Sequence, residues 1–97
     1  MTDININDLR QILCHYGREA QKDKLKEELN ELIEAVEDQQ ENDCEQTNNH
    51  YIEELADVSI MVEQMILAMD ISEQCKYYSM INYKIDRQLR RIENEKS

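Results

Sequence analysis

Glycine and proline, the residues that most often interrupt helices, are almost absent from this chain of 97 residues. The sequence contains no proline, and its only glycine is Gly17. Residues that favour helices, chiefly Leu, Glu, Lys, Gln, Met and Ala, dominate the remainder. The sequence therefore predicts an all-α protein, and its length predicts a single domain over residues 1–97.

The N-terminal half predicts two helices, because its apolar residues recur three and four positions apart. The first helix follows Asn5, which can cap it, and ends at Gly17. The second helix covers about residues 19–41, and the polar, Asn-rich stretch 42–49 predicts the loop after it. The apolar stripe of the second helix consists of Leu25, Leu29, Leu32, Ile33 and Val36.

The C-terminal half predicts two further helices, which makes the subunit four-helix bundle-type. The third helix spans about residues 50–69 and is apolar around most of its later circumference, as a central helix would be. Asp70-x-x-Glu73 resembles a capping box for the fourth helix. The apolar surplus of residues 58–69 exceeds what one small bundle easily covers, so a second subunit is expected.

The net charge of −11, from 22 acidic and 11 basic residues, argues against nonspecific binding to nucleic acid or to an anionic membrane. The N-terminus lacks the basic and apolar segments of a secretion signal, and no apolar run is long enough to span a membrane. The widely spaced Cys14, Cys44 and Cys75 form no C-x-x-C pair and are expected to be reduced thiols. These observations predict a soluble, cytoplasmic protein.

Two pairs of acidic residues stand at helical spacing, Glu28-x-x-Glu31 in the second predicted helix and Glu54-x-x-Asp57 in the third. Residues three apart lie one above the other on a helix, so each pair directs two carboxylates at one place. Such like-charge pairs destabilise an isolated helix by roughly 0.2–0.5 kcal/mol each. Their repetition on two helices joined by a short loop predicts a bound cation that offsets the repulsion.

A helical wheel at about 100° per residue locates these carboxylates relative to the apolar faces. Glu28 and Glu31 border the stripe of the second helix, whereas Glu27 leans toward solvent. Glu54 falls inside the apolar arc of the third helix, and Asp57 lies at its margin. A lone buried carboxylate either becomes neutral or costs several kcal/mol, so Glu54 requires a partner.

The four paired carboxylates are hard oxygen donors, which favours Mg²⁺, with Mn²⁺ as a substitute, over zinc. The Glu-x-x-His pairs of di-iron bundles are absent, since neither His15 nor His50 follows a glutamate by three residues. Four carboxylates can hold more than one divalent ion. A glutamate-rich helix can also be simply a solvated face, and that interpretation predicts no ion.

The acidic motifs match the pattern of a known family. The sequence EELNE at residues 27–31, followed after a spacer by ELAD at residues 54–57, resembles the EExxE…ExxD pattern of the MazG-like, all-α nucleoside triphosphate pyrophosphohydrolases. The segments QKDKL, at residues 21–25, and YKIDR, at residues 83–87, are also similar, and the resemblance spans about residues 9–92. It implies Mg²⁺-dependent hydrolysis of a (d)NTP to the nucleoside monophosphate and pyrophosphate, as in the cleansing of nucleotide pools.

The resemblance also implies roles for the acidic residues. The metal ligands would be the four paired carboxylates, Glu28, Glu31, Glu54 and Asp57. Glu27 would hold an outer-shell water or help to activate the nucleophile.

The substrate contacts that the resemblance implies lie near the two ends of the chain. The cations that would neutralise the polyphosphate are Lys84, Arg87 and Arg91. The chain lacks the Trp and Phe residues that often stack on the base in this family. The aromatic residues that would replace them are Tyr16, His15 and Tyr83.

One subunit offers too few walls for a nucleotide pocket, and the resemblance implies a homodimer or a dimer of dimers in which the last helix completes a neighbour's site. Two alternatives stay open. The related phosphoribosyl-ATP pyrophosphatases share the fold and the metal chemistry. A non-enzymatic helical interaction module would instead use its acidic faces for solubility or for a basic partner.

Overall fold

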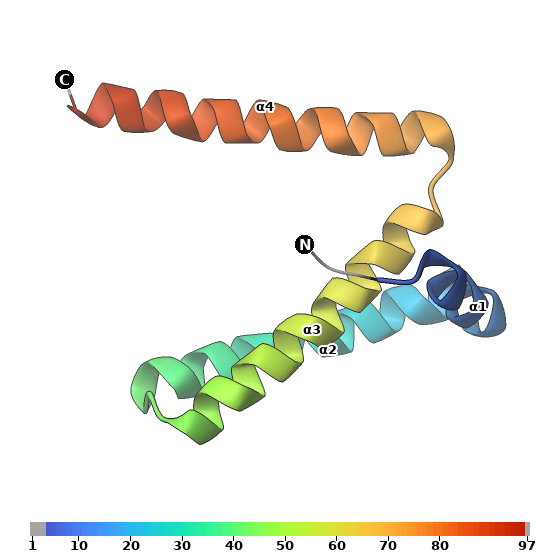
Figure 1. The fold of residues 1–97 in the computed structure, drawn as a ribbon, viewed down its shortest axis with the longest axis horizontal. Coiled ribbons are helices and arrows are strands. Elements are labelled where there is room, and N and C mark those ends of the chain that lie inside the picture. Colours follow the sequence, from blue (N-terminus) through green and yellow to red (C-terminus); the bar gives the residue numbers. More distant parts are fainter. Residues whose placement is uncertain (1–3, 97) are drawn as a thin grey trace.

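The computed structural model describes residues 4–96 and confirms the all-α prediction. The helices within that range are α1 (Ile6–Tyr16), α2 (Arg18–Glu41), α3 (Glu45–Leu67) and α4 (Ile71–Lys96), and it contains no strand (Figure 1). None of these helices combines the length and the apolar character that crossing a membrane requires.

The predicted ends of α1 are confirmed. The Asn5 side chain caps the helix by accepting hydrogen bonds from the backbone N–H groups of Asn7, at 3.0 Å, and Asp8, at 3.3 Å. Gly17 separates α1 from α2 with φ of +90°, a conformation that L side chains rarely adopt, and its N–H donates to the Leu13 carbonyl. The chain therefore turns at its only glycine.

The predicted loop 42–49 is wrong over its second half, because α3 begins at Glu45. The Thr47 hydroxyl accepts a hydrogen bond from the Cys44 N–H at 3.1 Å and donates one to the Asn42 carbonyl at 2.6 Å. These bonds start the helix one turn before its apolar periodicity begins. A periodicity criterion therefore placed the start too late.

The capping box predicted before α4 is confirmed. The Glu73 N–H donates to the Asp70 carboxylate at 2.8 Å, and the Asp70 N–H donates to the Glu73 carboxylate at 3.1 Å. The third helix accordingly ends at Leu67, two residues before the predicted end.

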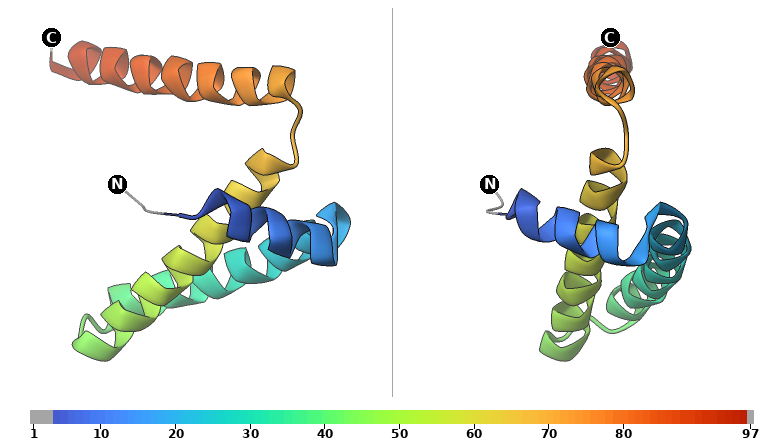
Figure 2. Two further views of the ribbon diagram at one scale, coloured as in Figure 1. Left: turned by 45° about the vertical axis from the view of Figure 1, so that its right-hand side comes forward. Right: turned by 90° about the vertical axis from the view of Figure 1, so that its right-hand side faces the viewer.

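Three of the four helices pack together. Helices α2 and α3 form an antiparallel pair, and α1 lies across them, whereas α4 runs apart from the other three in all views (Figures 1 and 2). The radius of gyration is 16.7 Å, compared with about 13 Å for a compact domain of this length. A single chain is therefore a three-helix unit with a projecting fourth helix.

The core of this unit is small. Only four hydrophobic side chains in the described range are buried, namely Leu9, Ala35, Met61 and Ile66. The buried residues of α2 are Gln21, Glu28 and Ala35, which stand seven positions apart.

The predicted stripe of α2 is not its most buried face. Leu29 is 41% exposed and Ile33 is 55% exposed, whereas Glu28, predicted at the border, is buried. This correction follows from the packing, because α3 covers only one side of the stripe.

Candidate metal centre

Three carboxylates from two helices converge in the interface between α2 and α3. Glu28 on α2 and Glu54 and Asp57 on α3 each offer an oxygen, and these oxygens lie within 4.8 Å of one another. The two α3 residues are three positions apart and share a face, and the antiparallel crossing brings Glu28 opposite them. The convergence predicted from the spacing is thus present for these three residues.

Two of these carboxylates are buried with unused hydrogen-bonding capacity. Glu28 and Glu54 are each 6% exposed. The Oε2 atoms of both residues are buried and have no hydrogen-bond partner among the described residues. Because native structures rarely leave buried carboxylate oxygens unpaired, these two atoms point to a ligand between the helices.

The remaining predicted ligand, Glu31, lies beside this cluster. The Glu31 side chain is exposed, but the charge of its carboxylate raises the pKa of Glu54. Burial raises the pKa of Glu54 above its ordinary value, and the nearby carboxylates of Glu31, Asp57 and Glu28 raise it further. The four predicted carboxylates therefore share one electrostatic site.

Lys24 supplies a cation close to this site. Its Nζ lies 3.3 Å from a Glu28 oxygen and 3.4 Å from a Glu27 oxygen, and these hydrogen bonds raise the pKa of Lys24. The Glu27 carboxylate is exposed, as predicted. One lysine against four neighbouring carboxylates still leaves an excess of negative charge, which a divalent ion would reduce.

His50 also borders the site, although it was not predicted to. Its Nδ1 lies 4.0 Å from a Glu54 oxygen, one helical turn away. The spacing of four residues could have indicated this contact, because the predicted helix 50–69 includes both residues.

The raised pKa of Glu54 predicts an unusual pH dependence for the metal-free protein. The folded chain binds this proton more tightly than the unfolded chain, so the free energy of unfolding falls as pH rises above about 4.3 through the raised pKa. Urea denaturation in EDTA is expected to show higher stability near pH 5 than near pH 7. Glu54→Gln should flatten this dependence, and an equal slope in the variant would contradict the assignment.

The predicted substrate contacts on α4 are not brought to this cluster within one chain. Tyr83, Lys84 and Arg91 are exposed, and the Arg87 guanidinium lies 5.8 Å from the centre of the Tyr83 ring. Within residues 4–96, no ion pair joins these cations to the clustered carboxylates. Figure 1 shows α4 separated from the α2–α3 pair.

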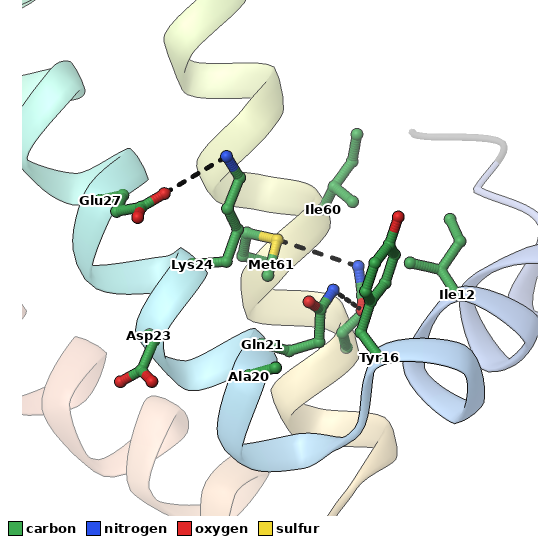
Figure 3. A pocket seen from close by; sticks show the side chains of 10 residues that line it. Ile12, Tyr16, Ala20, Gln21, Asp23, Lys24, Glu27, Ile60 and Met61 are labelled. Carbon is green, nitrogen blue, oxygen red and sulfur yellow. Dashed lines mark hydrogen bonds and ion pairs between the residues drawn. The ribbon is translucent and has the colours of Figure 1, made fainter.

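A pocket of about 490 Å³ lies beside the cluster, toward α1 (Figure 3). Helices α1, α2 and α3 all contribute to its walls. Its lining residues are Ile12, Tyr16, Ala20, Gln21, Asp23, Lys24, Glu27, Ile60, Met61 and Gln64. Tyr16, one of the predicted base contacts, thus lines the pocket. The His15 ring lies edge-on to the Tyr16 ring, with 4.6 Å between the ring centroids.

The pocket contains a polar pair that the sequence analysis missed. The Gln21 side-chain amide donates a hydrogen bond to the Gln64 side-chain carbonyl at 2.7 Å, and both residues are buried. The Gln64 amide also approaches the Met61 sulfur at 3.9 Å. Gln64 follows Asp57 by two helical turns, so its place on the face of the acidic motif was readable from the spacing.

Comparison with known proteins identifies no relative. No family model matches the chain, no curated protein matches it, and no solved structure matches it.

Proposed function

We propose that the protein is a Mg²⁺-dependent nucleoside triphosphate pyrophosphohydrolase. The observation that supports the proposal best is the convergence of three carboxylates from two helices, with two buried oxygens left unpaired. The donor set fits magnesium, since it consists of carboxylate oxygens, from two buried residues and the half-buried Asp57. The resemblance of the acidic motifs to the MazG-like family adds the reaction.

The residues present divide naturally between metal binding and water positioning. Glu28, Glu54 and Asp57 would hold the ion, and Glu31 would join them by a rotation of its exposed side chain. When bound, magnesium would polarise the phosphates and lower the pKa of the attacking water. Glu27, exposed beside the pocket, can accept a hydrogen bond from that water and orient it.

The proposal includes a homodimer or a dimer of dimers. Ile71, Tyr78, Ile85 and Ile92 stand seven positions apart on α4, and all four are exposed in the single chain. A heptad repeat of apolar residues on an unpartnered helix is typical of a helix–helix interface. A second copy of this chain is the partner that the proposal assigns to this face.

Pairing through α4 would also bring cations of one subunit to the carboxylate cluster of its neighbour. Lys84, Arg87 and Arg91 lie on the same helix as the apolar repeat but away from the carboxylates of their own chain. On a neighbouring subunit, they would face the polyphosphate and neutralise its charge.

One other class of function has a specific observation in its favour. The exposed apolar face of α4 would equally suit a non-enzymatic interaction module. That function predicts no stabilisation by divalent ions and no pyrophosphate release.

Phosphoribosyl-ATP is the substrate that separates the related phosphoribosyl-ATP pyrophosphatase activity from the proposed one.

A pyrophosphate-release screen tests the proposal. Standard and damaged (d)NTPs, together with phosphoribosyl-ATP, would be incubated with the full chain in Mg²⁺ or in EDTA. We expect release from at least one (d)NTP, with Mg²⁺ only, because the site's charge requires the ion. Absence of release from the whole panel, with an unchanged melting temperature on adding Mg²⁺, would reject the enzymatic proposal.

A further inference from the structure

The imidazole of His50 lies at the exposed margin of the carboxylate cluster, one helical turn before Glu54 on α3. Its Nδ1 is 4.0 Å from Glu54 Oε1. The His50 side chain is 51% exposed, and within residues 4–96 this is the only polar contact of the ring. A ring nitrogen is therefore available to bind an ion beside the carboxylates.

We propose that His50 is a nitrogen ligand of this metal centre, and that it makes the site selective for divalent transition metal ions, with Mn²⁺ as the probe, over Mg²⁺. The inference rests on the proposed function in one respect, since it takes an ion to be bound by Glu28, Glu54 and Asp57. It adds a ligand that lies outside both acidic motifs.

The buried oxygens of the cluster give an independent reason to expect an ion there. The Oε2 atoms of Glu28 and Glu54 are buried and have no hydrogen-bond partner among the described residues. His50 approaches the other oxygen of Glu54, Oε1. An ion bound by the Glu54 carboxylate would thus have a nitrogen donor within reach.

The distance between the two side chains suits a shared ion. Ligand atoms that stand about 2.1 Å from an ion in octahedral coordination are about 3 Å apart at adjacent positions and about 4 Å apart at opposite positions. The 4.0 Å between His50 Nδ1 and Glu54 Oε1 falls at the upper end of this range and is too long for a hydrogen bond. Residues four apart share a helix face, so the backbone of α3 keeps the two side chains together.

The chemistry of imidazole determines which ions would gain from His50. Mg²⁺ takes oxygen ligands and gives up its water reluctantly, whereas imidazole nitrogen binds transition metal ions. Carboxylates alone accept both Mg²⁺ and Mn²⁺. The contribution of His50 is therefore measured by the change in the ratio of the two affinities when the imidazole is removed, rather than by the ratio itself.

Metal affinity can be measured without turnover, by calorimetric titration of the full chain with MnCl₂ or MgCl₂ in the absence of nucleotide. In His50→Ala, the affinity for Mn²⁺ should fall about tenfold or more, whereas the affinity for Mg²⁺ should change by less than about twofold. The variant should fold, because His50 is exposed and alanine favours a helix. Asn49→Ala is the matched control, since it places the same residue one position earlier at an exposed site, and it should leave both affinities unchanged.

Pulsed electron paramagnetic resonance of the Mn²⁺-loaded chain detects the nitrogen directly. The chain has only two histidines, and the other, His15, lies on α1. We expect the echo of bound Mn²⁺ to carry ¹⁴N modulation from a coordinated imidazole in the wild type and in Asn49→Ala, and to lose it in His50→Ala.

Three results would overturn the inference. They are a wild-type echo without ¹⁴N modulation, an unchanged Mn²⁺ affinity in His50→Ala, and an equal loss of affinity for both ions. The second is the result that a simple surface pair of His50 and Glu54 would give.

The two proposals fail separately. If Mn²⁺ is bound through His50 but the pyrophosphate screen is negative, the ligand assignment stands and the enzymatic proposal is rejected. If pyrophosphate is released but Mn²⁺ is bound without nitrogen, the enzyme stands and His50 is not a ligand. If neither ion binds to the wild type, the inference is overturned together with the metal centre.

Discussion

Replacing Glu54 with glutamine is expected to remove both the response to Mg²⁺ and the release of pyrophosphate. Turnover should fall by about 10³-fold or more, because Glu54 is one of the three clustered carboxylates and, under the proposed function, its loss would weaken binding of the ion that activates the water. In the wild type, Mg²⁺ at about 100-fold above its Kd should raise the melting temperature by roughly 10–20 °C. The variant should lose most of this rise.

The same substitution should stabilise the protein when no metal is present. Glutamine keeps the shape of the side chain but removes a charge that burial and three neighbouring carboxylates disfavour. In EDTA at neutral pH, the melting temperature of Glu54→Gln should therefore exceed that of the wild type, whereas in Mg²⁺ the order should reverse. A merely structural role for Glu54 would lower the melting temperature under both conditions.

Glu53→Gln is the matched control, because it makes the same chemical change one position earlier, at an exposed site on the same helix. It should leave the metal response and the turnover at wild-type levels. A Glu54→Gln protein that is stabilised by Mg²⁺ as strongly as the wild type would show that Glu54 is not a ligand.

Local signals in the sequence were sufficient to predict most of the helices. Asn5 and Gly17 act within one turn of the helix that they delimit, and the capping box at Asp70 and Glu73 requires only those two side chains. The start of α3 escaped prediction because Thr47 makes its hydrogen bonds to a stretch without apolar periodicity. Where polar capping side chains start a helix before its apolar residues recur, periodicity places that start too late.

The tertiary placement of α4 could not be predicted in the same way. An amphipathic helix reveals that it has an apolar face, but it does not reveal whether its own chain or another covers that face. The exposed Ile33 and Leu29 on α2 reflect the same ambiguity. A second subunit can bury a residue that is exposed in the single chain, and the local sequence pattern does not reveal this.

The candidate site was predictable to the extent that it depends on spacing within one helix. Glu54 was predicted to be buried because its angle on the wheel follows from its own helix, and it is buried in the structure. The Lys24–Glu28 ion pair also follows from spacing, since the two residues stand four apart on α2, whereas the Gln21–Gln64 pair depends on the rotation of one helix about another. A single amphipathic pattern determines that rotation only to within the width of its apolar stripe.

Two inactive variants are expected to restore activity to each other when they share an oligomer. Glu54→Gln removes the metal site and leaves α4 intact, whereas a double variant, Lys84→Ala with Arg87→Ala, keeps the carboxylates and removes the cations of α4. If α4 completes the site of a neighbour, one of the two sites in a hybrid pair combines intact carboxylates with intact cations. Co-expressed, differently tagged chains purified through both tags should show about half of the wild-type turnover per pair.

The result distinguishes a site completed by α4 of the neighbouring subunit from a site completed by α4 of the same subunit. If each subunit used its own α4, both sites of the hybrid would contain a defect and the turnover would stay at the level of the parents. Ile85→Glu, placed in the apolar repeat of α4, should abolish the recovery by preventing subunits from pairing, and light scattering should then report monomers. Recovery that persisted in monomers would contradict pairing through α4, whereas its loss together with the oligomer would locate the phosphate-binding cations on the neighbouring subunit.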